Sequence, residues 1–305
     1  MIRIKTARIL RVSVRTSIPS PVTIRSPFRG DRGRVKLLEP PGTDFGRIRE
    51  QLLDGTYPKP FVLEEQGARS LHFSRSLVQS GMRLDAPWAL EFAYTRQMMA
   101  FLLFVPEPRE ILVLGLGGGS LVKYCHRHLP RANLTVVEID PHVIAFRDEF
   151  RVPPDDERLR VRLGDAAEHV ARMRAGADVI LMDAFDRDGA APSLSARDFH
   201  ADAHAALAKH GVLVANLVGE DRRRMAHLEH IHAAFGANVI LVPVEEDGNH
   251  IAFAFRDPAF EPRWRWIESR AHAMRKRHGL DFPRMAAMLE RSRKLGYARR
   301  ALRAA

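Results

Sequence analysis

The segment ILVLGLGGGSLVKYC, which begins at Ile111, constrains the fold of this chain more than any other stretch. An apolar run stops at Gly115, passes through the glycines at 117–119 and continues with helix-forming residues. This pattern predicts a buried strand, a tight turn and the start of a helix. Glycine suits such a turn because it adopts positive φ angles and has no Cβ to block a ligand against the main chain. We therefore predict that Gly115, Gly117 and Gly119 hold a ligand.

A second apolar run, LTVVEIDP, begins at Leu134 and ends in the acidic residues Glu138 and Asp140. A carboxylate at the end of the next strand can reach the ribose hydroxyls of a nucleoside held over the glycine turn. Ser120 replaces the third glycine of a dinucleotide fingerprint, so adenosine joined to a sulfonium amino acid fits the pattern better than nicotinamide or flavin. The alternative is a tight turn with no ligand.

Strand and helix patterns alternate along the rest of this region, which predicts a mostly parallel, doubly wound α/β sheet. Strands are expected near residues 111–115, 134–139, 159–163, 178–183, 211–217, 237–243 and 250–256, and helices near 119–129, 141–150, 166–174, 194–209 and 219–235. The last two strands are joined only by VEEDGN, which is too short for a crossover helix and predicts an antiparallel hairpin. This is the layout of the class I methyltransferase-like fold.

Four segments are predicted along the 305 residues. Residues 1–45 are rich in Arg, Ser and Pro and lack periodicity, so we expect a basic, flexible N-terminal extension. Residues 46–105 combine short alternating stretches with one helical stretch, which predicts a small β-rich subdomain plus a helix. Residues 106–260 form the Rossmann-like nucleoside-binding catalytic domain, and residues 261–305 form basic C-terminal helices.

The net charge of +11 is concentrated at the two ends of the chain. Residues 1–45 carry +7 and residues 251–305 carry +9, which leaves −5 for residues 46–250. No aromatic stacking platform or helix-turn-helix pattern accompanies the basic ends, so we do not expect nucleic-acid binding.

Other classes of protein are disfavoured by the same sequence. No apolar run approaches the roughly 18 residues of a membrane span, and the N-terminus lacks the apolar core of a signal peptide, so we expect a cytoplasmic protein. The single cysteine, Cys125, excludes a cysteine-based zinc site. Neither His126 with His128 nor His200 with His204 has the context of a metal motif, so we expect no metal.

Acidic residues follow two further predicted strands, at the sheet edge where ligands bind in such folds. Asp165 can accept a hydrogen bond from an adenine amino group beside the small Ala166, or it can simply cap the next helix. Asp183 ends an otherwise apolar strand, and Asp186 follows three residues later. Two such carboxylates can converge on one cationic group, one orienting it and the other accepting its proton.

The ordered set ILVLGLGGGSL, VVEIDP, RLGDAAEHV and DVILMDAFD, preceded by VQSGMRL and AYTRQMM, resembles the spermidine synthase (polyamine aminopropyltransferase) family. The resemblance covers roughly residues 60–255. It implies transfer of an aminopropyl group from decarboxylated S-adenosylmethionine to an amine such as putrescine, without a metal, in an enzyme that forms a homodimer.

The resemblance also implies roles for individual residues. Gly115, Gly117 and Gly119 would wrap the sulfonium nucleoside, Glu138 would bind its ribose, and Asp165 with Ala166 its adenine. Asp183 would be the catalytic aspartate, Asp186 the acidic partner that binds the amine, and Gln79 and Tyr94 would line the pocket.

The sequence also departs from the family pattern. The acidic residue that holds the donor's free amine in the family is matched by Gly118, and a donor-binding Gln is matched by Glu64. Two alternatives therefore remain open: a methyltransferase that uses S-adenosylmethionine itself, and a catalytically silent nucleoside-binding homologue.

Overall fold

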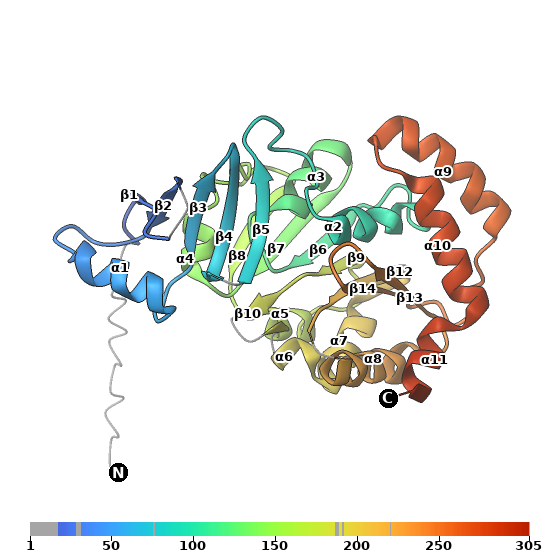
Figure 1. The fold of residues 1–305 in the computed structure, drawn as a ribbon. Coiled ribbons are helices and arrows are strands. Elements are labelled where there is room, and N and C mark those ends of the chain that lie inside the picture. The colour runs from blue at the N-terminus through green and yellow to red at the C-terminus, as the bar shows by residue number, and fades with distance from the viewer. Residues whose placement is uncertain are drawn as a thin grey trace, which may run out of the picture.

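The computed structural model describes residues 18–304 apart from residues 29–31, 76, 187–188, 191 and 220. The described part of the chain forms a central seven-stranded sheet in the order β13-β14-β12-β9-β6-β7-β8 (Figure 1). Its strands are β6 (Glu110–Leu114), β7 (Asn133–Glu138), β8 (Leu159–Leu163), β9 (Ala177–Met182), β12 (Leu207–Leu217), β13 (Val239–Val244) and β14 (Asn249–Phe255). Neighbouring strands from β12 to β8 run parallel, whereas β14 is antiparallel to both β12 and β13. The predicted doubly wound sheet with an antiparallel terminal hairpin is confirmed.

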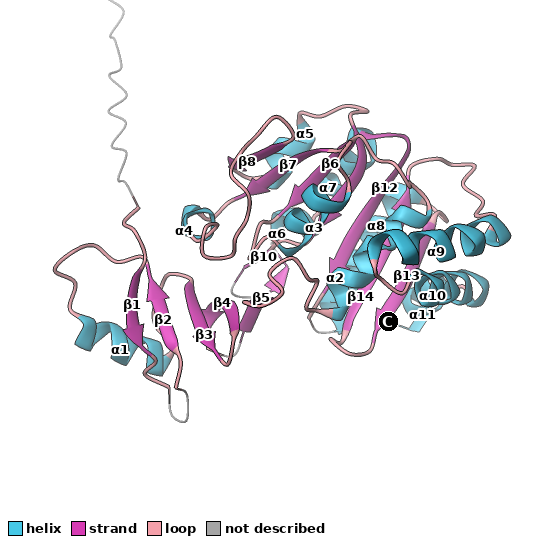
Figure 2. Cartoon of the chain, turned by 90° about the horizontal axis from the view of Figure 1, so that it is seen from above, coloured by secondary structure: helices cyan, strands magenta, loops and turns pink. Residues whose placement is uncertain are grey.

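Helices cover both faces of this sheet (Figure 2). The helices are α3 (Ser120–His128), α4 (Pro141–Ala145), α5 (Ala166–Ala171), α6 (Pro192–Ser195), α7 (Arg197–Ala206) and α8 (Asp221–Phe235). Along β6, Val113 packs into the hydrophobic core that α3 and α4 cover, whereas Leu112 and Leu114 pack into the core that α5, α7 and α8 cover. Successive side chains of a strand point to opposite faces of the sheet, and helices cover both faces. The strands in the middle of the sheet therefore consist of uninterrupted apolar runs.

A second, antiparallel sheet precedes the central one and lies beside it (Figure 1). Its strands are β1 (Val22–Arg25), β2 (Arg34–Leu37), β3 (Phe61–Glu65), β4 (Ala68–Ser74) and β5 (Leu77–Arg83), and α1 (Phe45–Asp54) connects β2 to β3. A short two-stranded ribbon, β10 (Phe185–Asp186) with β11 (Gly189–Ala190), follows β9.

The first two strands of the N-terminal sheet correct the predicted flexible extension of residues 1–45. Residues 22–25 pair with 34–37, and β2 then pairs with β3, so this stretch belongs to the folded sheet. The strands are too short and too polar to show a pattern alone, and Val35 and Leu37 are buried only because α1 and β3 cover them. Residues 1–17 lie outside the described residues, and the division into four segments stays a prediction.

The segment before the central sheet contains α2 (Ala93–Met98) followed by a 3₁₀ helix, η1 (Met99–Leu103). In the described part of the chain, three helices follow β14: α9 (Trp264–His278), α10 (Phe282–Leu295) and α11 (Tyr297–Ala304). Gly296 separates the last two with φ 59°, the left-handed conformation that commonly ends a helix. No helix among the described residues has the length and apolar character needed to cross a bilayer.

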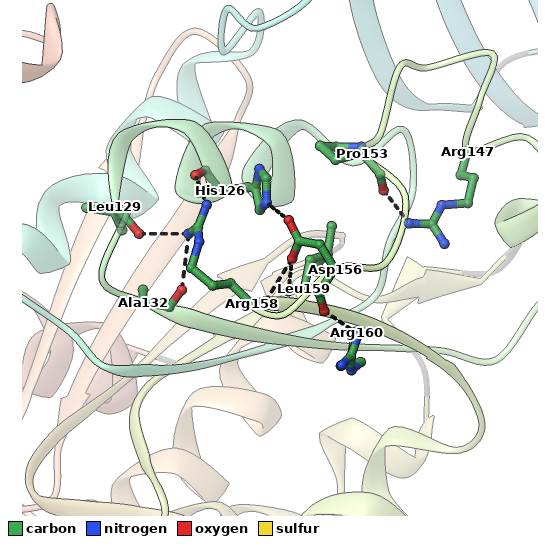
Figure 3. Close-up of polar contacts among 9 residues, drawn as sticks. All are labelled: His126, Leu129, Ala132, Arg147, Pro153, Asp156, Arg158, Leu159 and Arg160. Atoms are coloured by element: carbon green, nitrogen blue, oxygen red, sulfur yellow. Dashed lines mark hydrogen bonds and ion pairs between the residues drawn. The ribbon is translucent and has the colours of Figure 1, made fainter.

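A group of polar contacts ties the connection before β8 to α3 (Figure 3). Asp156 pairs with Nε2 of His126 at 2.8 Å and accepts hydrogen bonds from the backbone N–H groups of Arg158 and Leu159. The hydrogen bond with His126 is the main reason that the pKa of Asp156 falls to about 2. The guanidinium group of Arg158 donates to three backbone carbonyls near the end of α3, including that of His126. His126 therefore has a structural role, because it links α3 to the connection before β8.

Candidate active site

A pocket lies at the carboxyl ends of the parallel strands, under the edge of the N-terminal sheet, and encloses about 910 Å³ including space open to solvent. Most of the predicted site residues line it: Gln79, Tyr94, Gly115, Gly117, Glu138, Asp165, Ala166 and Asp183. Gly119 does not line the pocket, and the side chain of Asp186 lies outside the described residues. Residues as far apart as Gly115 and Asp183 meet here because parallel strands end at the same edge of a sheet. Gln79 from β5 and Tyr94 from α2 join them from the N-terminal side.

Gly115 ends β6 with φ 92°, and its N–H donates to the carbonyl oxygen of Val137 at 2.9 Å. A Cβ at this position would lie 2.4 Å from the carbonyl oxygen of Asp183. The close approach that requires glycine here is therefore to the backbone after β9. The same contact fixes the Asp183 backbone relative to the turn. Gly115 also lines the pocket, and its contact with a ligand stays a prediction.

The remaining glycines of the turn differ in what surrounds them. Gly117 faces the pocket, and the nearest atom to an added Cβ is Cβ of Ser80 at 3.7 Å. At Gly118 an added Cβ would lie 2.7 Å from Oγ of Ser80 and 2.8 Å from the ring of Phe150, so the turn has no room for an acidic side chain there. Gly119 packs against Val152, which explains why it is a glycine although it lies outside the pocket lining.

A buried lysine that sequence reasoning missed supports this turn. Lys123 lies in the first turn of α3, is 1% exposed, and donates from Nζ to the carbonyl oxygen of Phe150 at 2.8 Å. Burial, together with the nearby charge of Arg151, lowers the pKa of Lys123 to about 8. The contact holds Phe150 against Gly118. The feature of the sequence that could have indicated this buried lysine is its position among apolar residues of α3.

Glu138 at the end of β7 is 8% exposed and has both carboxylate oxygens occupied by backbone donors. Oε2 accepts from the N–H of Leu116 at 2.8 Å and Oε1 from the N–H of Asp140 at 2.9 Å. Burial raises the pKa of Glu138 above its usual value, although these hydrogen bonds oppose the shift. The carboxylate is thus held rigidly beside the turn, with lone pairs left for further donors.

Asp165 both caps a helix and lines the pocket, and its contact with adenine stays a prediction. Its Oδ1 accepts from the N–H groups of Ala167 at 2.7 Å and Glu168 at 3.3 Å, so it caps α5. Asp165 and the adjacent Ala166 also line the pocket.

Asp183 follows β9, and each of its carboxylate oxygens accepts one hydrogen bond from a side chain. Nδ2 of Asn216, from β12, donates to Oδ1 at 2.9 Å, and the hydroxyl of Tyr94, from α2, donates to Oδ2 at 3.3 Å. Burial raises the pKa of Asp183 to about 6, while the bonds from Asn216 and Tyr94 lower it. A carboxyl group with this pKa is ionised at neutral pH and can still accept a proton.

The two donors to Asp183 are a tyrosine that the sequence analysis placed in the pocket and an asparagine that it did not. Burial, followed by the charge of Asp183, raises the pKa of Tyr94 well above its usual value, so this hydroxyl remains a neutral donor. Asn216 is 2% exposed and lies near the end of the strand predicted at residues 211–217. Its signal was one polar residue closing the buried run VLVAN.

Glu64, which matches a donor-binding residue of the family, does not line the pocket. Its Oε2 pairs with the guanidinium group of Arg69 at 2.5 Å on the N-terminal sheet. Arg69 also pairs with Glu149 at 2.9 Å, in the segment that leads to Phe150. Glu64 therefore helps to attach the N-terminal sheet to the central domain.

The charged side chains that line the described part of the pocket are three carboxylates, those of Glu138, Asp165 and Asp183, with no Lys, Arg or His among them. This acidic lining occurs in a chain with a net charge of +11. The three carboxylates favour a cationic ligand in the pocket, because like charges that are buried without a counter-charge are unfavourable. No cluster of at least three His, Cys, Asp or Glu side chains that could hold a metal occurs among the described residues.

Comparisons with known proteins relate this chain to one family. Residues 91–233 match the family model of the spermine/spermidine synthase domain. A polyamine aminopropyltransferase of Neisseria meningitidis serogroup A is 36% identical over 238 residues, which are 77% of this chain and 90% of that protein.

Two solved structures show the same fold. A spermidine synthase in complex with the transition state analogue AdoDATO superposes with a TM-score of 0.61 at 18% identity, covering 93% of this chain and 88% of that one. Human methyltransferase-like protein 13 in complex with SAH superposes with a TM-score of 0.54 at 23% identity, covering 67% and 93%. The sequence identity and coverage shared with the aminopropyltransferase, together with the matched domain, show that this chain belongs to the spermidine synthase (polyamine aminopropyltransferase) family.

Proposed function

We propose that this protein transfers an aminopropyl group from decarboxylated S-adenosylmethionine to an amine such as putrescine, in polyamine biosynthesis. The observation that carries the proposal is the acidic pocket with Asp183 at its base. A sulfonium donor and an ammonium acceptor are both cations, and both suit a cavity lined by carboxylates. Family membership supports the same reaction.

The proposed reaction is an in-line displacement. The amine nucleophile is inert while protonated, so Asp183 accepts its proton first. The nitrogen lone pair then forms a bond to the aminopropyl carbon next to sulfur, while the carbon–sulfur bond breaks and its electron pair stays on sulfur. The products are the alkylated amine and neutral methylthioadenosine. Holding both substrates in one pocket supplies much of the rate enhancement.

The binding roles follow from the position of each residue. We assign the ribose hydroxyls to Glu138 and the adenine to Asp165 with Ala166. Gly115 and Gly117 border the sulfonium nucleoside, Gly119 supports the turn, and Gln79 and Tyr94 close the pocket from the N-terminal side. Asp186 is proposed to bind the amine, and a homodimer working in the cytoplasm is proposed on family resemblance.

The test is to incubate the purified protein with putrescine and each donor in turn and to identify the nucleoside product. Release of methylthioadenosine from decarboxylated S-adenosylmethionine is expected. Release of S-adenosylhomocysteine from S-adenosylmethionine would instead support a methyltransferase, which the crowding at Gly118 and the methyltransferase-like neighbour keep as the second candidate. A protein that consumes neither donor would be the silent homologue.

The rate of transfer is expected to depend on pH through Asp183. The pKa of this carboxyl group is about 6, and only its ionised form accepts a proton, so kcat/KM should fall as pH drops below about 6. Tyr94→Phe removes a hydrogen bond that lowers this pKa, so the acidic limb should move to higher pH. Initial rates between pH 5 and 8 check both expectations. A limb that moves to lower pH in Tyr94→Phe would contradict them.

A further inference from the structure

The turn between β13 and β14 reaches across the structure to the helix that carries Tyr94. Oδ2 of Asp247, in this turn, accepts a hydrogen bond from the backbone N–H of Tyr94 at 2.6 Å. Phe92, the residue that precedes α2, makes no capping hydrogen bond with its side chain. Asp247 therefore satisfies a backbone donor at the start of α2 that the helix itself leaves open.

The position of this backbone determines where the Tyr94 hydroxyl lies. The Tyr94 ring stacks on Phe92, with centroids 5.9 Å apart and an angle of 20° between the planes. At the far end of the ring, the hydroxyl donates to Asp183 at 3.3 Å. A tyrosine has only two side-chain torsions, so a stacked ring carries a displacement of its backbone to its hydroxyl.

The turn that provides Asp247 is itself held in place. The N–H groups of Asp247 and Gly248 both donate to the carbonyl oxygen of Val244, at 3.3 and 2.9 Å. The neighbouring Glu246 pairs with Arg284 of α10 at 3.3 Å. The C-terminal helices, for which the sequence suggested no role in the site, thus contact the turn that caps α2.

On the basis of the proposed function, we propose that Asp247 is a positioning residue: through the Tyr94 backbone it holds the Tyr94 hydroxyl on Asp183. Asp183 also faces Asn216 of β12, and the other carboxylates of the pocket are those of Glu138 and Asp165. Asp247 is exposed and does not line the pocket, so it acts through the tyrosine.

A double-mutant cycle tests this inference. Asp247→Ala should lower kcat about three- to tenfold, the rate factor that corresponds to the free energy of one helix cap, and should move the acidic limb of the pH profile in the same direction as Tyr94→Phe. In the Tyr94→Phe background, Asp247→Ala should cause little further loss, because the hydroxyl that it positions is absent. If the two losses multiply, or if Asp247→Ala leaves the limb unchanged, the proposal is overturned.

Two further variants separate positioning from charge. Asp247→Asn keeps an oxygen that accepts from the Tyr94 N–H, so it should restore most of the rate. Glu245→Gln removes one charge from the same turn without touching a Tyr94 contact, and should match the wild type. If Glu245→Gln reproduced the effect of Asp247→Ala, the charge of the turn would be responsible and the positioning role would be refuted.

A readout without catalysis distinguishes this inference from the proposed function. The pKa of Asp183 can be measured by ¹³C NMR of labelled carboxyl groups, with Asp183→Asn identifying the resonance. An increase in Asp247→Ala, absent in the Tyr94→Phe background, supports positioning even if no methylthioadenosine is formed. An unchanged pKa overturns the inference even if the wild type is an active aminopropyltransferase.

Discussion

Asp183→Asn is expected to lower kcat for aminopropyl transfer by about 10²–10⁴-fold, the usual contribution of a positioned general base. The substitution keeps the shape of the side chain and an oxygen for Asn216, but an amide cannot accept the amine proton at neutral pH. The acidic limb of the pH profile should disappear, and the affinity for the donor nucleoside should stay within about twofold. Single-turnover rates and calorimetric titration with methylthioadenosine measure the two quantities separately.

Asp178→Asn is the matched control, because Asp178 lies near the start of β9 and Asp183 follows its other end. Its carboxylate accepts from the backbone N–H groups of Arg109 and Glu110, away from the pocket, and the amide oxygen of Asn keeps one such acceptor. This variant should retain the wild-type rate. Asp183→Asn with more than about a tenth of wild-type turnover would show that Asp183 is not the base, since general-base catalysis is worth far more than this.

Gly115→Ala is expected to lower the free energy of unfolding by about 3 kcal/mol or more. An alanine at φ 92° is strained, and its Cβ would lie 2.4 Å from the carbonyl oxygen of Asp183. A left-handed backbone costs about 1–2 kcal/mol, and overpacking against a rigid neighbour adds about 1–3 kcal/mol. Because the overlapping atom belongs to Asp183, turnover should also fall. Urea denaturation measures the loss of stability.

Gly117→Ala separates the strain of the backbone from the overlap. Gly117 also has a positive φ, of 51°, but its added Cβ makes only ordinary contact with Ser80 at 3.7 Å. This variant should lose about 1–2 kcal/mol from strain alone. Equal losses in the two variants would mean that the backbone after β9 moves away from residue 115 without cost, and that the contact does not hold the site together.

The sequence alone predicts the central sheet closely because its signals are local. Strand β8 was predicted at the residues it occupies, and the other strands of this sheet start and end within a few residues of their predicted positions. The strands in the middle of this sheet contain continuous apolar runs, since both of their faces are buried, and they end at glycine or polar residues. The edge strand β8 alternates apolar residues with arginine and is buried only at Leu159. The N-terminal strands β1 and β2 lack this signal, because they are four residues long and obtain their burial from α1 and β3.

Some residues of the candidate site could also be identified from local sequence signals, whereas others could not. The carboxylates of Glu138, Asp165 and Asp183 were identifiable because each lies at or just after the carboxyl end of a strand, where parallel strands present their ends to a ligand. Glu64 could not be placed in this way: its family position suggested a role in the pocket, and its pairing with Arg69 is decided by the register of β3 and β4.

What the sequence by itself determined is the order of strands and helices, the glycine turn and the acids at the strand ends, because each depends on residues close together in the chain. Only the tertiary structure decided which groups touch Asp183 and why Gly115 must be a glycine. Tyr94 and Asn216 lie 89 and 33 residues from Asp183, and Asp247 lies 153 residues from Tyr94. Such contacts depend on how the sheets and helices pack together, and no local pattern of residues records that packing.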